Sequence, residues 1–160
     1  MRMKVVQLIA IITTALYLVP TGAHLLELRN KIALTATEYL TVQKIYAGWS
    51  LFGVVVGVAL LATLAHTLLV RADRAAFAWS LGAFVALAAT QGLFWAFTYP
   101  VNAATAFWTV PPDSFEVARR QWEYSHAASA VLTFAALVAI VLAALLHKPS
   151  AEAPGVRPAA

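Results

Sequence analysis

The chain alternates long apolar tracts with shorter polar connections, and this pattern predicts its helices. Four apolar tracts cover roughly residues 5–28, 45–70, 75–101 and 124–146. Each is long enough to cross a hydrocarbon core of about 30 Å, which takes about 20 residues of α-helix. The tracts are continuous and lack the alternation of barrel strands, and helices satisfy their own backbone groups in lipid. We therefore expect an all-α fold, an integral membrane four-helix bundle formed by residues 1–148.

The three connections between these tracts differ in length and composition. Residues 71–74 form a brief turn, whereas residues 29–44 and 102–123 are long and rich in aromatic and polar groups. Both long connections fall on the same side of a four-span bundle, and functional residues are concentrated on elaborated loops. Within the second one a Pro-Pro-Asp sequence breaks the chain, and a helix is predicted to begin after Ser114, its N-cap, and to continue into the fourth span.

Composition places the chain in a membrane and excludes several functions. Hydrophobic residues make up 62% of the sequence and charged residues only 11%, far from the balance of soluble domains. The absence of cysteine excludes disulfides and thiol chemistry, and a net charge of +4 without a basic run does not indicate a nucleic-acid partner. The first tract has some features of a signal peptide, but its apolar run exceeds the usual 7–15 residues, which favours a retained span. Residues 149–160 are rich in proline and alanine and are expected to be a disordered tail.

Lysine and arginine are distributed so that the side carrying both termini is predicted to be cytoplasmic. Six of the eleven basic residues lie on that side, mostly in short segments, where the positive-inside rule is most reliable. We expect a multi-pass protein of the cell inner membrane whose elaborated connections face outward. Its expected partners are membrane lipid and a lipophilic small molecule, and the composition is compatible with a homo-oligomer.

Polar residues recur at helical spacing near the outward ends of all four spans. Residues three, four and seven apart share one face of a helix. The first span presents His24 and Glu27, and the fourth presents Glu123 and His126, whereas His66 and His147 belong to the opposite end. Because ionisable groups in lipid usually face the bundle interior, we expect a shared polar chamber. The side chains expected to line it and contact a substrate are Gln43, Tyr46, Trp95, Tyr99, Asn102 and Trp122.

Four chemistries are compatible with this pair of imidazoles and carboxylates. In HLLE (24–27) and EYSH (123–126) the two groups are three residues apart, the spacing of Glu-x-x-His metal ligands, which predicts iron or another divalent metal on His24, Glu27, Glu123 and His126. Alternatively, the two histidines hold a haem iron from both sides. In a third, cofactor-free possibility one imidazole is a general base, oriented by a glutamate, that acts on a phenolic or quinone-like substrate. In the fourth the residues are structural: Glu123 pairs with Arg119 or Arg120, and Glu27 pairs with Lys31.

Four segments together carry a resemblance to a known family. They are PTGAHLLELRNKI, YLTVQKIYAGWSLFG, FWAFTYPVNAATAFWTVPP and ARRQWEYSHAASAVLTF. The chain resembles the bacterial branch of a small four-span membrane family that also includes the fungal anthrone oxygenase-like proteins. The resemblance implies a four-helix membrane bundle, oxidation of a polycyclic phenol, no firmly implied cofactor, and matching positions at His24, Trp122 and His126.

These observations predict an oxygenase or oxidoreductase that acts on a lipophilic aromatic compound. Its expected catalytic residues are His24, Glu27, Glu123 and His126. The competing interpretation is a non-enzymatic membrane protein, either a small-molecule binder or carrier or a subunit of a membrane complex.

Overall fold

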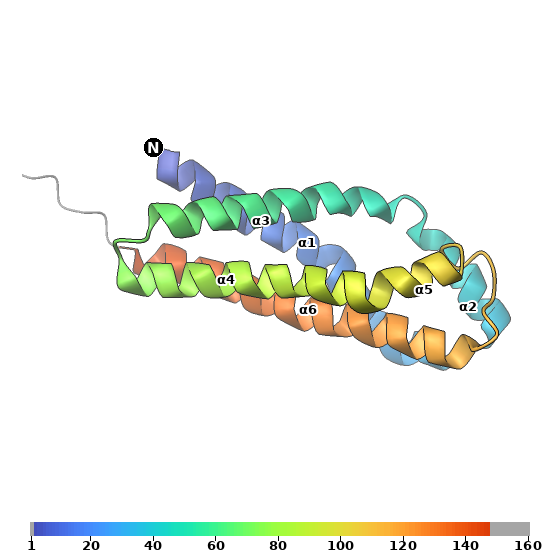
Figure 1. Cartoon of the computed structure of the whole chain (residues 1–160). Helices are drawn as coiled ribbons and strands as arrows, with labels where there is room; N and C mark the ends of the chain where they lie inside the picture. The colour runs from blue at the N-terminus through green and yellow to red at the C-terminus, as the bar shows by residue number, and fades with distance from the viewer. Residues whose placement is uncertain (1, 148–160) are drawn as a thin grey trace, which may run out of the picture.

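The computed structural model describes residues 2–147 and is all-α, as predicted, with no strand in that range. Residues 149–160, predicted to be a disordered tail, lie outside the described residues. Four helical stretches are long and apolar enough to cross a membrane: Arg2–Ile32, Trp49–Leu69, Arg74–Ala104 and Phe115–Leu146. The chain is therefore a multi-pass membrane bundle, and Figure 1 shows its long helices running side by side.

The spans are built from nine helical elements. They are α1 (Arg2–Ile32), α2 (Ala36–Gln43), η1 (Lys44–Tyr46), η2 (Trp49–Leu51), α3 (Phe52–Leu69), α4 (Arg74–Leu93), η3 (Phe94–Thr98), α5 (Tyr99–Ala104) and α6 (Phe115–Leu146) within the described range. α6 packs against both α1 and α4, and α1 also packs against α3. The predicted helix before the fourth span is confirmed as the first turns of α6, although Ser114 at its N-cap position makes no side-chain capping bond.

Large apolar side chains cover the outside of the bundle, and small residues fill its centre. Leu26, Leu61 and Leu145 are 84%, 70% and 76% exposed. The central core is built mainly from buried alanines, together with Tyr17, Val56, Leu87 and Ile140. Small residues at helix contacts and large apolar residues toward the surroundings are typical of packing in lipid.

The third span changes its helical type before Pro100. α4 is followed by the π-helical segment η3, in which the Tyr99 N–H donates to the Phe94 carbonyl, and the span then continues as α5. Proline has no N–H and its ring collides with the carbonyl four residues earlier, so the wider π turn accommodates Pro100. The extra residue in that turn rotates the following side chains relative to a regular helix.

Both elaborated connections lie at one end of the bundle, which we call the loop end, while the described termini lie at the other (Figure 1). α2 begins with a capping box, in which the Thr35 hydroxyl accepts from the Glu38 N–H and the Glu38 carboxylate accepts from the Thr35 N–H. These reciprocal bonds satisfy two of the donors that a helix N-terminus leaves unpaired. They fix the direction in which α2 leaves α1 and folds back over the loop end.

A left-handed turn follows α5. Ala106, Phe107 and Trp108 have φ angles of 45°, 56° and 62°. The turn is held by bonds from the Trp108 N–H to the Thr105 hydroxyl (3.0 Å) and from the Phe107 N–H to the Asn102 carbonyl (2.7 Å). Such φ values cost about 1–2 kcal/mol per non-glycine residue. The result is that Trp108, only 4% exposed, is turned back into the loop end.

We expect Ala106→Gly to raise the free energy of unfolding by up to about 1 kcal/mol. Glycine removes the strain of the left-handed backbone in the folded state. Part of this gain is lost because glycine also increases the conformational entropy of the unfolded chain. The matched control is Ala103→Gly in the regular helix α5, which should lower stability by about 1 kcal/mol. Denaturant unfolding in detergent, followed by circular dichroism, measures both. Equal destabilisation by the two variants would show that the turn is not strained.

Candidate functional site

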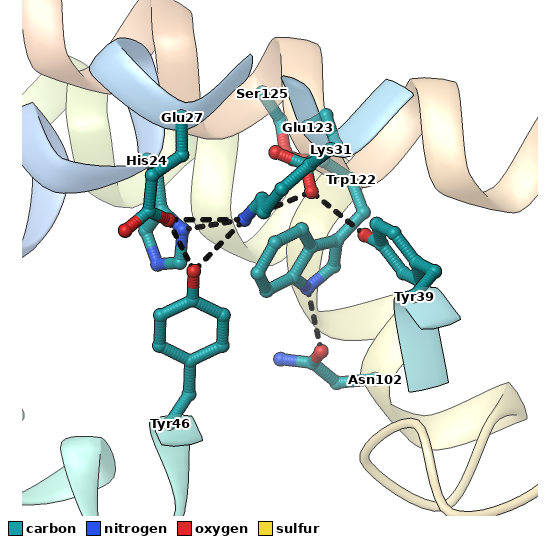
Figure 2. A network of polar contacts seen from close by, with 9 residues as sticks. All are labelled: His24, Glu27, Lys31, Tyr39, Tyr46, Asn102, Trp122, Glu123 and Ser125. Atoms are coloured by element: carbon teal, nitrogen blue, oxygen red, sulfur yellow. Dashed lines mark hydrogen bonds and ion pairs between the residues drawn. The ribbon is translucent and has the colours of Figure 1, made fainter. Parts of the chain in front are cut away.

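Side chains from α1, α2, η1 and α6 meet at the loop end. We call this set the polar cluster: His24, Glu27, Lys31, Tyr39, Tyr46, Trp122, Glu123 and His126. α1 contributes His24, Glu27 and Lys31 from one face, because they are spaced by three and four residues. Figure 2 shows the Lys31 ammonium pointing between the groups contributed by the other elements.

The two predicted histidines are in direct contact. The ring centroids of His24 and His126 are 4.2 Å apart with an angle of 32° between the ring planes. The Trp122 ring lies 4.2 Å from His126 and 4.9 Å from His24. Tyr46 and Trp49 cover His24 at centroid distances of 4.6 and 5.7 Å. The imidazole pair is therefore enclosed by aromatic rings.

Lys31 is the centre of the hydrogen-bond network, although only 3% of its surface is exposed. Its Nζ lies 2.9 Å from Glu123 Oε1, 3.1 Å from the Tyr46 hydroxyl and 3.2 Å from His24 Nδ1. An ammonium has three N–H donors and no acceptor, so these partners all accept from it. His24 therefore carries its ring hydrogen on Nε2.

The tyrosines extend the network to both carboxylates. The Tyr39 hydroxyl donates to Glu123 Oε1 at 2.8 Å, and the Tyr46 hydroxyl donates to Glu27. Burial raises the pKa of Tyr39, and the adjacent Glu123 carboxylate raises it further. Burial, followed by the hydrogen bond to Glu27, likewise raises the pKa of Tyr46. Both phenols therefore remain neutral donors.

The ion pairs in part confirm the structural interpretation of the charges. Glu27 lies 3.6 Å from the Lys31 ammonium, so the predicted Glu27–Lys31 pair is confirmed. The predicted pairing of Glu123 with Arg119 or Arg120 is wrong, because Glu123 bonds Lys31 across helices. Arg119 instead donates to Glu116 and to the Leu34 carbonyl, each at 2.6 Å. The sequence did not show that Lys31 from α1 would reach a carboxylate on α6.

The predicted metal and haem ligands do not form a set that fits either group. Among residues 2–147 no three or more histidine, aspartate or glutamate side chains are grouped so that they could hold a metal ion. The carboxylates of Glu27 and Glu123 are turned toward Lys31. The contacting rings of His24 and His126 leave no space between them for a macrocycle with iron at its centre.

Two of the predicted lining residues lie elsewhere. Trp95 and Tyr99 are 61% and 41% exposed and pack against each other at 5.0 Å on the surface, so they do not line an internal chamber. Two other predicted lining residues lie at the loop end. Asn102 reaches the cluster, since its Oδ1 accepts from Trp122 Nε1 at 2.7 Å. Gln43 is buried in the same helix as Tyr39.

His66 was predicted to belong to the opposite end of the bundle. It bonds Ser80 there, as expected.

Several buried polar atoms of the loop end have no hydrogen-bond partner among the described residues. They are His126 Nε2, Glu123 Oε2, Gln43 Nε2, Trp108 Nε1 and Arg119 Nε. Most buried polar atoms in proteins are bonded, and each exception costs about 1–3 kcal/mol and needs an explanation. His126 Nε2 and Glu123 Oε2 belong to residues three apart on one face of α6. They give the cluster an imidazole nitrogen and a carboxylate oxygen that its own network does not use.

Three residues at the site were not among the predicted site residues. They are Lys31, which belongs to the polar cluster, and Trp49 and Trp108, which contact it. Lys31 follows His24 by seven residues, so its position on the same face was visible in the sequence. Trp108 centres 4.9 Å from Tyr39 and 6.0 Å from Trp122 because of the left-handed turn, for which the sequence gives no glycine or asparagine signal. Trp49 is placed by the turn at Gly48, whose φ is 86°.

We expect Lys31→Met to lower the free energy of unfolding by about 3–5 kcal/mol, because it leaves the fully buried Glu123 carboxylate without its cation. The double variant Lys31→Met/Glu123→Gln should recover much of this loss. Lys44→Met, at an exposed lysine of the same end, is the control and should change stability by less than about 0.5 kcal/mol. Denaturant titration in detergent measures all three. A double variant less stable than Lys31→Met alone would argue against a buried ion pair.

No protein-family model matches this chain, and neither a curated protein nor a solved structure does. The comparisons thus neither support nor contradict the resemblance to anthrone oxygenase-like proteins. Function therefore has to be inferred from the geometry of the polar cluster.

Proposed function

We propose that the polar cluster is a cofactor-independent proton-transfer site that oxidises a lipophilic aromatic compound of the phenol or anthrone type with dioxygen. The observation that carries this proposal is the buried Nε2 of His126, which has no partner among the described residues and lies in an aromatic enclosure. A buried imidazole with a free nitrogen can take a proton from a weakly acidic substrate. The resemblance to anthrone oxygenase-like proteins agrees with this chemistry.

His126 is the general base in this proposal. Its ring contacts both His24 and Trp122, which also contact each other, so it has little freedom to rotate away from a substrate. Glu123, one turn earlier on α6, is held by Lys31 and Tyr39 through one carboxylate oxygen, and its other oxygen is free of protein partners in the described chain. In this proposal Glu123, three residues before His126 on α6, supplies the negative charge that stabilises the imidazolium formed when the base accepts a proton.

Lys31 and His24 are positioning residues. Lys31 fixes the tautomer of His24 through Nδ1, and His24 in turn provides the surface on which His126 stacks. Tyr46 and Trp49 extend this surface with rings that suit a flat aromatic substrate. A cofactor-free reaction requires such preorganisation, because the protein supplies only orientation and proton transfer.

The overall reaction balances without a bound metal. For an anthrone, His126 removes one proton from the ring methylene, and the resulting anion is oxidised by dioxygen. The methylene carbon loses two hydrogens and gains one oxygen atom as a carbonyl, and the second oxygen atom leaves with the two hydrogens as water. Dioxygen is thus both the oxidant and the source of the new oxygen.

The same proposal places the cluster on the outward side of an inner membrane. The described termini lie at the end of the bundle opposite the polar cluster. The order of the spans along the sequence assigns six of the eleven basic residues to the terminal side. By the positive-inside rule the terminal side is cytoplasmic. A lipophilic substrate would then be oxidised near the outer surface of the bilayer.

We expect His126→Gln to lower kcat/KM for anthrone oxidation by about 10²–10⁴-fold, the usual contribution of a general base. The purified protein in nanodiscs is incubated with anthrone in air, and the anthraquinone absorbance and dioxygen uptake are followed together. The control is His147→Gln, at the C-terminal end of α6 beside Asp73, which should retain the wild-type rate. Full activity in His126→Gln, or anthrone binding without any turnover by the wild type, would contradict the proposal, and the latter would favour a carrier.

A further inference from the structure

α6 carries a second feature beside the polar cluster, toward the third span. A groove of about 420 Å³ lies between α6 and the third span, lined by Leu93 and Phe97 on one side and by Arg120, Tyr124 and Ala128 on the other. At 100° per residue, Tyr124 and Ala128 are about 100–160° around α6 from Glu123 and His126, whereas Arg120 is about 60° from Glu123. None of the residues that line the groove belongs to the polar cluster. α4 and η3 both pack against α6, and Figure 1 shows α4 beside α6.

The groove is preformed by the backbone. It lies where the π turn of η3 replaces a regular helix, opposite the small residues Ser125 and Ala128 of α6. Ser125, which lines it, shares a 2.8 Å hydrogen bond with the Thr98 hydroxyl. The Gln121 amide also donates to the Phe97 carbonyl at 3.0 Å. These bonds keep the two helices in register while their larger side chains form the walls.

Charge and depth identify the kind of molecule that fits. The groove is mainly apolar, and about 12 Å of α6 separates Arg120 from Ala128 at 1.5 Å per residue. Arg120, near the beginning of α6, is exposed and has no carboxylate within ion-pair distance among residues 2–147. Its neighbour Arg119, by contrast, is buried and paired with Glu116. An unpaired guanidinium at one end of an apolar groove on a membrane-facing surface complements an amphiphile with an anionic head.

We propose that this groove is a binding site for one anionic phospholipid, whose phosphate pairs with Arg120 and whose acyl chain lies along Leu93, Phe97 and Tyr124. Guanidinium groups bind phosphate through two parallel hydrogen bonds.

The test is native mass spectrometry of the delipidated protein titrated with phosphatidylglycerol or with phosphatidylcholine of the same acyl chains. The wild type should retain one phosphatidylglycerol more tightly than phosphatidylcholine. Arg120→Gln should weaken phosphatidylglycerol binding about fivefold, the effect of one interfacial cation, with little change for phosphatidylcholine. The matched control, Arg29→Gln, removes an exposed arginine of α1 outside the groove and should leave both affinities unchanged.

A second variant tests the groove without changing its charge. Ala128→Trp fills the apolar end and should weaken binding of both lipids, while glycerol phosphate without acyl chains should bind neither protein measurably. Equal retention of the two lipids by the wild type, or unchanged phosphatidylglycerol binding in Arg120→Gln, would overturn the proposal. Circular dichroism confirms that each variant keeps its helices. None of these measurements depends on anthrone oxidation, so the lipid site and the proposed reaction succeed or fail separately.

Discussion

The loop end depends on one buried cation held between carboxylates from two helices. Lys31 is 3% exposed and Glu123 is fully buried, and charged residues at membrane depth cost about 2.5–3.5 kcal/mol each on insertion scales. Either charge, if buried without the other, would destabilise the fold. Because Lys31 belongs to α1 and Glu123 to α6, their pairing fixes the relative rotation of these two helices. The tyrosine hydroxyls then attach α2 and η1 to the same centre.

The geometry of the imidazole pair follows from that centre. All three ammonium hydrogens of Lys31 are used, one of them by His24 Nδ1, so the ring of His24 cannot rotate without losing a bond to a buried cation. His24 therefore presents a fixed face to His126. What the network leaves unused is as important as what it binds, since His126 Nε2 and Glu123 Oε2 remain without partners in the described chain. A purely structural cluster would be expected to satisfy these atoms, which is why we regard the cluster as a site.

The sequence predicted the spans well because their signal is local, and it predicted side-chain directions only where the helices are regular. On α1 and α6 the three- and four-residue spacing placed His24, Glu123 and His126 correctly on facing surfaces. On the third span the same extrapolation failed for Trp95 and Tyr99, because the π turn of η3 adds a residue to the helical repeat and the two side chains are exposed. Ion pairs between different helices could not be predicted from the sequence, for a different reason. The choice of Lys31 over Arg119 as the partner of Glu123 depends on how α1 and α6 pack, which no spacing within one helix can show.

The half of the bundle near the described termini mainly stabilises the fold, whereas the loop end carries the candidate site. Toward the described termini, α1, α3, α4 and α6 pack through alanines. The buried hydroxyls of Thr63 and Thr133 donate to carbonyls one turn earlier in their own helices, whereas that of Thr14 has no partner among the described residues. That half leaves few polar atoms unpaired and holds the four helices together in lipid. The loop end combines a buried ion pair, three left-handed residues and several unpaired polar atoms. Strain and unsatisfied groups persist only where the surrounding structure over-determines them, and they are concentrated at functional sites. The packing of the opposite half therefore offsets the free-energy cost of the strain and the unpaired polar atoms at the loop end. That cost is best explained if the unpaired atoms of α6 act on a substrate.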